Sequence, residues 1–225
     1  MIIQDLTPLS VTPLSAFDSV NPTTGQPWAR IPEASAADAD RAVRAAHRAF
    51  TEGPWSKMTP TERGKLLRKL GDLLAEKSED LGRAETVDTG KLFKETRWQA
   101  KYIADFFHYN AGLADKIHGD TMPIDKPDMY VFTTREPLGV VAAVAPWNSR
   151  LFLVAVKLGP ALAASNTVVL KASEHASAPI AEFGGFKDSG YGRESGFQAI
   201  YDYTRPKTIW INTSADPIAN PFVMR

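Results

Sequence analysis

Residues 139–170 contain a strand–helix–strand pattern, which limits the possible folds of this chain more than any other feature. Gly139–Ala145 is a continuous apolar run, as expected of a strand that is covered on both faces. Leu151–Ala164 has apolar residues at helical spacing, although Pro160 is expected to kink or restart the helix. Thr167–Leu170 is a second short buried strand. This order predicts a βαβ unit at the beginning of a parallel sheet, and the chain supplies no obvious further strand for that sheet.

The N-terminal part predicts a hairpin followed by a capped helix. Asn21–Gly25 is typical of a turn, since Pro sets φ and Gly supplies a positive φ, and it separates Phe17–Val20 from Trp28–Pro32. Ser35, with Asp38 three residues later, has the spacing of a capping box. The apolar face of the helix that begins there consists of Ala39, Ala42, Val43, Ala46 and Phe50.

Two further helical regions follow. Thr59, Pro60 and Glu62 predict a helix start, leucines recur at helical spacing after them, and Gly90 marks a stop. A longer helix is predicted from about Phe93 to Ile117, and we interpret its aromatic stripe as core packing rather than as a cofactor surface. The stripe consists of Trp98, Tyr102, Phe106, Tyr109 and Leu113.

The pattern changes after Pro127. Met129–Arg135 alternates and predicts a strand with one buried face. Beyond Pro179 we expect a Gly-rich loop, a short helix near Gly196–Tyr203 and a final strand at Thr208–Ile211. Residues 185–190 in that loop have the glycine spacing of a P-loop, but Lys and Ser do not follow and no buried strand precedes, so phosphate binding is rejected there.

Composition excludes several classes of function. The 225 residues carry 26 acidic and 26 basic side chains, which gives no reason to expect a nucleic-acid partner or an anionic membrane surface. The apolar runs are too short to span a bilayer, and the N terminus has no secretion signal, so we expect a cytoplasmic protein. Cysteine is absent, so the sequence contains no disulfide, no thiolate zinc site and no thiol nucleophile, and we predict no metal site.

Three segments resemble the aldehyde dehydrogenase superfamily: Val20–Ser35, Glu136–Glu174 and Phe183–Ile211. The resemblance implies an α/β fold with N-terminal helices, a truncated Rossmann-type parallel sheet and a small antiparallel bridging sheet. It divides the chain into an N-terminal helical and bridging region (1–135), a truncated dinucleotide-binding region (136–180) and a C-terminal loop, helix and bridging strand (181–225). Members of this family oxidise aldehydes to acids with NAD or NADP.

The resemblance also implies roles for individual residues. Asn148 matches an asparagine that helps to stabilise the oxyanion, which suits a neutral donor aimed into a dry site, and Lys157 matches a lysine near the active site. Pro146 and Trp147 precede Asn148 in the cofactor-contacting segment. Lys171 and Glu174 match the pair that binds the adenosine ribose, and a carboxylate there favours NAD over NADP.

Each of these residues also has a plain structural reading. Asn148 can be a turn or cap residue, Lys157 can extend from a helix to solvent, and Lys171 with Glu174 can be a solvated pair. Arg150, Ser165 and Ala172 stand where the family commonly has Pro, Gly and Pro, which indicates relaxed selection on the cofactor site.

The resemblance implies elements that have no counterpart between Pro179 and Phe183. They are the loop that contacts the cofactor pyrophosphate, the glutamate base, the cysteine nucleophile and a later glutamate that holds the nicotinamide ribose. We therefore predict that this chain alone does not oxidise aldehydes, as a catalytically inactive remnant of the family. The alternative is a non-catalytic assembly or binding module.

The expected partners follow from the same resemblance. Met129–Arg135 and Thr208–Ile211 match the two halves of a subunit-bridging sheet, so we expect a homo-oligomer or pairing with a full-length relative. An aldehyde substrate is implied by the family, and NAD binding through Lys171 and Glu174 is a third, weaker possibility.

Overall fold

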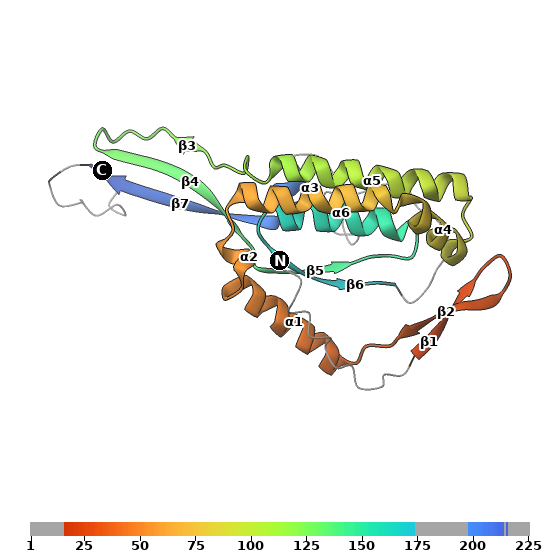
Figure 1. The fold of residues 1–225 in the computed structure, drawn as a ribbon. Helices are drawn as coiled ribbons and strands as arrows, with labels where there is room; N and C mark the ends of the chain where they lie inside the picture. Colours follow the sequence, from red (N-terminus) through yellow and green to blue (C-terminus); the bar gives the residue numbers. More distant parts are fainter. Residues whose placement is uncertain (1–15, 174–197, 214, 216–225) are drawn as a thin grey trace.

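The computed structural model describes residues 16–173, 198–213 and 215. These residues form an α/β fold with a helical layer and three small sheets, one of which projects as a ribbon (Figure 1). The hairpin and the first helices come first, and the strands of the other two sheets follow α5. The elements of the N-terminal half are β1 (Ala16–Asn21), β2 (Gln26–Pro32), α1 (Ala36–Thr51), α2 (Pro54–Lys57), α3 (Pro60–Glu76), α4 (Ser78–Thr89) and α5 (Phe93–Leu113). The remaining elements are β3 (Thr121–Met122), β4 (Met129–Pro137), β5 (Val140–Val144), α6 (Arg150–Ala163), β6 (Thr167–Lys171), the 3₁₀ helix η2 (Gln198–Tyr203) and β7 (Thr204–Asn212).

The local signals at the helix ends behave as the sequence predicts. Ser35 and Asp38 form a reciprocal capping box on α1, and Thr59 and Glu62 form another on α3. Gly90 ends α4 with a φ of 73°, which glycine adopts without steric cost. Three details differ: Lys77 separates α3 from α4, α5 ends at Leu113 rather than near Ile117, and α6 runs through Pro160 as one helix.

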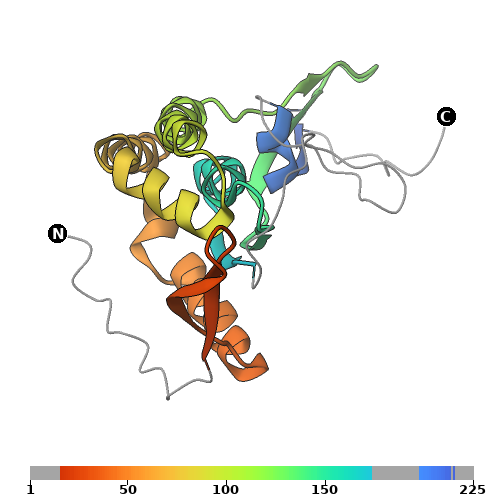
Figure 2. The same ribbon diagram turned by 90° about the vertical axis from the view of Figure 1, so that its right-hand side faces the viewer.

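The core lies where α5 packs against α3, α4 and α6 (Figure 2). Ile103, Phe106 and Phe107 of α5 are buried there beside Leu153 and Val156 of α6. The predicted aromatic core stripe is wrong for Trp98, Tyr102 and Tyr109, which are exposed, Trp98 to 63%. The buried face lies one to two residues further along the helix, and its small residues are Ala100, Ala104 and Ala111.

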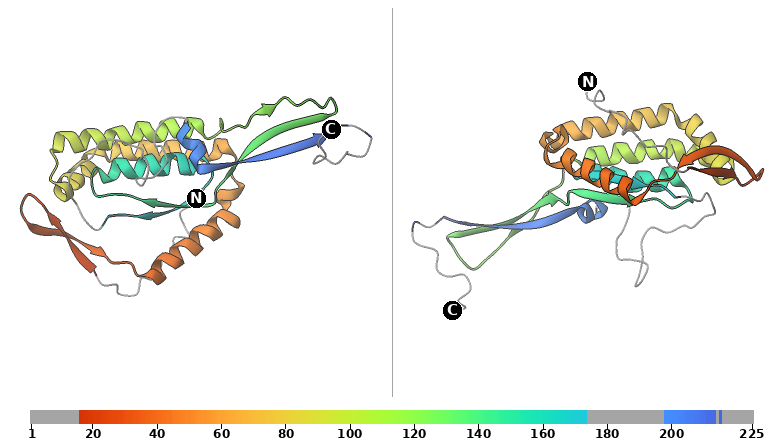
Figure 3. Two further views of the ribbon diagram at one scale, coloured as in Figure 1. Left: turned by 180° about the vertical axis from the view of Figure 1, so that it is seen from behind. Right: turned by 90° about the horizontal axis from the view of Figure 1, so that it is seen from below.

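Strands β5 and β6 pair in parallel, from Val140 opposite Thr167 to Val144 opposite Lys171, with α6 as the crossover. The predicted βαβ unit is therefore confirmed. The prediction that the first strand is covered on both faces is wrong, because Val144 is 60% exposed and Ala142 is exposed as well. Helix α6 covers one face, whereas α1 contacts the other face and diverges from it along its length, so no further strand or helix covers these residues within the described ranges (Figures 1 and 3).

Strands β4 and β7 form a long antiparallel ribbon that projects away from the helices, with β3 on the outer side of β4 (Figures 1 and 3). Its register runs from Met129 opposite Asn212 to Pro137 opposite Thr204, so the pairing of the two expected bridging strands is confirmed. The expected buried face is reduced to Val131, the one buried residue of β4. No helix among the described residues is long and apolar enough to cross a membrane.

Candidate functional site

The loop between β5 and α6 lies at the carboxyl edge of the parallel sheet. The Ala145 amide donates to the carbonyl oxygen of Lys171 over 3.0 Å, which holds the ends of the two strands side by side. Ligands of open α/β sheets bind outside the carboxyl ends of the strands. The structure thus brings the predicted residues Pro146, Trp147 and Asn148 to the same sheet edge as Lys171.

The other predicted residues are elsewhere or outside the described part. Lys157 lies two turns into α6, roughly 10 Å along the helix axis from Arg150. It is half-buried. Glu174 and the Gly-rich residues 185–192 lie outside the described residues. No group of three metal-ligating side chains is found in the part of the chain that the structure describes.

The N terminus of α6 is capped from another helix. Ser149 precedes α6 with a φ of 52°, and its side chain makes no capping hydrogen bond. The carboxylate of Glu85 in α4 instead lies beside the backbone amides of Arg150 and Leu151, which favour its ionised form. These two amides are among those that a helix start leaves without an intrahelical partner.

Glu85 is only 5% exposed, and its Oε1 atom is buried without a hydrogen-bond partner. Burial raises the pKa of Glu85, and this effect is opposed chiefly by the charge of Arg150 and by the two amides of α6, with a smaller contribution from Lys91. The positive charge of Arg150 and the start of α6 therefore favour an ionised carboxylate that burial disfavours.

Asp88, one turn along α4, is a second buried carboxylate and is 2% exposed. It forms an ion pair with Arg150 and accepts hydrogen bonds from the Ser19 hydroxyl and, over 3.0 Å, from Trp28 Nε1. Asp88 thus joins the β1–β2 hairpin, helix α4 and the beginning of α6. Burial lowers the pKa of Arg150, while the neighbouring Glu85 raises it.

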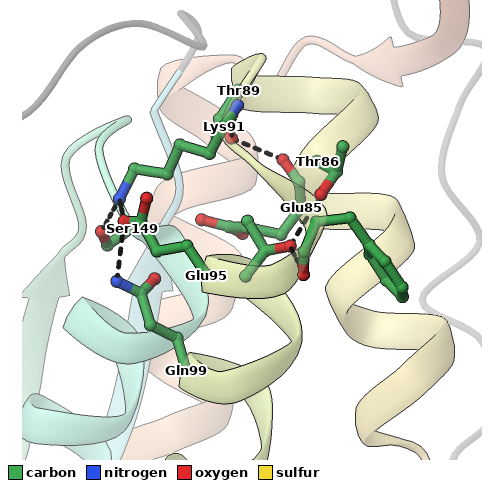
Figure 4. A network of polar contacts seen from close by, with 9 residues as sticks. Glu85, Thr86, Thr89, Lys91, Glu95, Gln99 and Ser149 are labelled. Atoms are coloured by element: carbon green, nitrogen blue, oxygen red, sulfur yellow. Dashed lines mark hydrogen bonds and ion pairs between the residues drawn. The ribbon is translucent and has the colours of Figure 1, made fainter.

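Lys91 extends this network toward α5 (Figure 4). Its ammonium group donates to the Ser149 hydroxyl and lies 3.0 Å from a carboxylate oxygen of Glu95, which also accepts from Gln99 over 3.3 Å. The Lys91 side chain is 14% exposed, so the pair with Glu95 is more shielded from solvent than the surface ion pairs. Ser149, the residue before α6, is therefore held by Lys91 from the connection between α4 and α5.

Three residues that sequence reasoning missed support this loop and sheet. Glu85 and Asp88 stand in a polar helical run, where buried and solvated carboxylates look alike. Asn166 is fully buried and accepts from the Gly139 amide over 2.9 Å while donating to the carbonyl oxygens of Ala161 and Tyr203. The available sequence signal was local: Asn166 follows Ser165, which stands after a helix end at a position where glycine is typical.

Comparisons with known proteins agree with this fold. The sequence model of the aldehyde dehydrogenase family matches residues 11–181. A curated relative from Acinetobacter baylyi, named (Z)-2-((N-methylformamido)methylene)-5-hydroxybutyrolactone dehydrogenase, is 55% identical over 183 residues. That match covers 81% of this chain and 36% of the relative.

Solved structures give the same result. An NAD-dependent aldehyde dehydrogenase from Sinorhizobium meliloti matches with a TM-score of 0.69 and 36% identity over 72% of this chain and 32% of its own. The protein PnpE, solved in complex with nicotinamide adenine dinucleotide, matches with a TM-score of 0.68 and 43% identity over 72% of this chain and 33% of its own. The chain thus spans about a third of the length of these relatives.

Proposed function

Because the chain belongs to the aldehyde dehydrogenase family, we propose that it carries one edge of a dinucleotide site and the subunit-bridging ribbon of such an enzyme, and that by itself it is catalytically incomplete. The family reaction is the NAD-dependent oxidation of an aldehyde to a carboxylic acid. That reaction needs a nucleophile that is ionised and strongly reactive near neutral pH, for which cysteine is best suited. The observation that carries the proposal is that the 225 residues contain no cysteine.

The residues at the sheet edge fit one end of NAD. Pro146, Trp147 and Lys171 lie at the carboxyl ends of adjacent parallel strands, and Lys171 is exposed and able to reach a ribose hydroxyl. Asn148 follows them as a half-buried neutral donor. NAD supplies a hydride acceptor when it is bound, but no residue among those described provides a pyrophosphate-binding glycine loop after a strand. We therefore propose contact with the adenosine end of NAD and no turnover.

Absorbance of NADH at 340 nm tests the catalytic part of this proposal. The purified chain is incubated with NAD and a panel of aliphatic and aromatic aldehydes, beside a buffer control and an intact relative as positive control. We expect no rate above buffer from the chain and a clear rate from the relative. Steady turnover by the chain with any aldehyde refutes the proposal.

Tryptophan fluorescence tests the cofactor part separately. We expect NAD to quench emission in a saturable manner, and Trp147→Phe to remove most of that response because Trp147 lies in the proposed contact loop. Trp210→Phe is the matched control, since Trp210 is exposed on β7 of the ribbon that projects away from the helices. A wild-type chain that shows no saturable quenching up to millimolar NAD contradicts cofactor binding.

The second candidate function is assembly through the β4–β7 ribbon. Strand β7 has nine residues and a free edge in the described sheet, and Tyr130, Trp210 and Ile211 are exposed on the ribbon. Free strand edges pair readily with strands of another chain. We propose that the ribbon binds a second copy of this chain or a full-length relative.

Size-exclusion chromatography with light scattering measures this association. We expect the wild-type chain to be dimeric or larger at micromolar concentration. Ile209→Pro is expected to yield a monomer, because proline removes a backbone donor and is disfavoured within a paired strand. A wild-type chain that is monomeric, both alone and mixed with a full-length relative, argues against the assembly role.

A further inference from the structure

Three separate elements meet at two buried carboxylates of α4. Asp88 binds the β1–β2 hairpin through Ser19 and Trp28, and it binds the beginning of α6 through Arg150. Glu85 lies at the same helix start, beside the backbone amides of Arg150 and Leu151. Arg150 is therefore the side chain that connects the α6 end of the candidate loop to the interior of the molecule.

We propose that Arg150 is a positioning residue that clamps the loop of residues 146–149 onto α4 and thereby keeps its residues aimed at the carboxyl edge of the sheet. The clamp itself depends only on the contacts described, whereas its effect on NAD rests on the function proposed above. Arg150 supplies both the charge that pairs with Asp88 and one of the backbone amides beside Glu85.

The charges around the clamp explain why this position needs a cation. Glu85 and Asp88 lie three residues apart on one helical face, so their two carboxylates are neighbours in a poorly solvated region. Arg150 contacts Asp88 and acts on Glu85, while Lys91 also acts on Glu85 and pairs with Glu95. Without Arg150, Asp88 would lose its ion pair, and Lys91 would be the one remaining cation among the groups that the structure shows acting on Glu85.

The contacts from α4 and Lys91 also compensate for the absence of a side-chain cap at the start of α6. Ser149 occupies the left-handed region and leaves α6 without a side-chain cap of its own. The helix start is instead fixed by Glu85, and the residue before it by the Lys91–Ser149 hydrogen bond. A loop with such external support holds its geometry only as long as the supporting side chains remain in place.

Hydrogen–deuterium exchange tests the clamp directly. Arg150→Met keeps most of the side-chain volume and removes the charge, Arg150→Lys restores a cation, and Arg44→Met removes an exposed ion pair on α1 as the matched control. We expect Arg150→Met to increase exchange of residues 146–152 and of the hairpin at least tenfold while α5 keeps its protection. Arg150→Lys should recover most of the lost protection, and Arg44→Met should leave it unchanged.

Carbon-13 NMR of the Glu85 carboxyl measures its pKa, which loss of the Arg150 charge would raise and loss of packing alone would not. We expect Arg150→Met to raise the pKa of Glu85 further and Arg150→Lys to return it toward the wild-type value. If Arg150→Met does not fold, Asp88→Asn provides the same test from the other partner, with faster exchange at residues 146–152 expected. Exchange and Glu85 titration that match those of the control variant overturn the clamp.

NAD titration separates the clamp from the proposed function. If Arg150→Met binds NAD about tenfold more weakly than the wild type and also exchanges faster, the result supports both the clamp and its role in cofactor contact. Faster exchange in Arg150→Met with no NAD binding by the wild-type chain supports the clamp and rejects its role in cofactor contact. Equal NAD affinity in wild type and Arg150→Met rejects that positioning role.

Discussion

Ser165 has a positive φ, which is unfavourable for a residue with a side chain. It follows the last turn of α6 with a φ of 70°, in the left-handed region where a Cβ atom costs energy. The position is the one that glycine usually occupies after a helix end. The departure from glycine noted in the sequence therefore has a structural cost.

Replacing Ser165 with glycine is expected to stabilise the fold by about 1 kcal/mol, because the left-handed strain disappears. Urea unfolding followed by circular dichroism measures the change. Ser165→Ala is the control, since alanine keeps the Cβ atom and gives no comparable gain. A glycine variant no more stable than the alanine variant would show that the strain is absent.

Glu85 makes folding depend on pH. Its pKa is raised above the unfolded value by burial, so the folded state holds the proton more tightly. The free energy of unfolding therefore falls as pH rises through the folded pKa of Glu85, and the corresponding stability is regained as pH falls toward the unfolded value near 4.5.

Comparison with Glu85→Gln isolates this group, because glutamine does not titrate and all other groups are shared. We expect the free energy of unfolding of the wild type, relative to the variant, to increase as pH is lowered from 8 to 4.5. Chemical denaturation at a series of pH values measures the difference. A constant difference, or one that changes in the opposite direction, contradicts the raised pKa.

At the scale of elements, helices α5 and α6 are in close contact because Gly159 has no side chain. A Cβ atom at Gly159 would lie 2.9 Å from Asn110 Nδ2 and 3.1 Å from a ring carbon of Phe106. Asn110 is buried and donates to the Phe106 carbonyl oxygen, so it cannot easily move away. The interface between the two helices is therefore built around this glycine.

Gly159→Ala is expected to destabilise the protein by about 1–3 kcal/mol through overpacking. Gly112→Ala on α5 is the matched control, because a Cβ atom there meets nothing within 4 Å. That control should gain up to about 1 kcal/mol from helix propensity. Thermal unfolding of both variants measures the contrast, and equal melting temperatures would contradict the close packing of α5 and α6.

The helix ends could be predicted where short-range sequence signals mark them. Ser35, Thr59 and Gly90 marked helix ends correctly because capping uses residues three or four positions apart. The aromatic stripe was wrong at Trp98, Tyr102 and Tyr109 because these large residues dominated the pattern, whereas the buried face of α5 also includes alanines. Asp88 was missed because its partner Arg150 lies far along the chain, and no local pattern records that pairing.

At the scale of the whole molecule, strand β5 is less buried than its apolar sequence predicts. The run Gly139–Ala145 has the composition of a strand covered on both faces, yet Val144 and Leu170 are exposed in the described structure. Parallel strands normally carry a covering layer on each face. Together with a match to about a third of each relative, these exposed strands agree with a chain that retains only part of a larger α/β sheet.

The family and the βαβ unit could thus be predicted from the sequence, and so could the pairing of the two ribbon strands through the resemblance. The loop residues Pro146, Trp147 and Asn148 lie at the same sheet edge as Lys171, since the carboxyl ends of the two parallel strands meet there, and their roles at that edge stay predictions. The clamp and the missing cover of the sheet could not be predicted, because both depend on contacts between distant segments.

A single-turnover experiment shows whether this chain can carry out even one round of aldehyde oxidation. Stoichiometric chain, NAD and a reactive aldehyde are mixed in a stopped-flow instrument, and NADH absorbance is followed with an intact relative as positive control. We expect no burst of NADH from this chain, because it has no cysteine to form the covalent adduct from which hydride leaves. A burst approaching one NADH per chain would contradict this expectation.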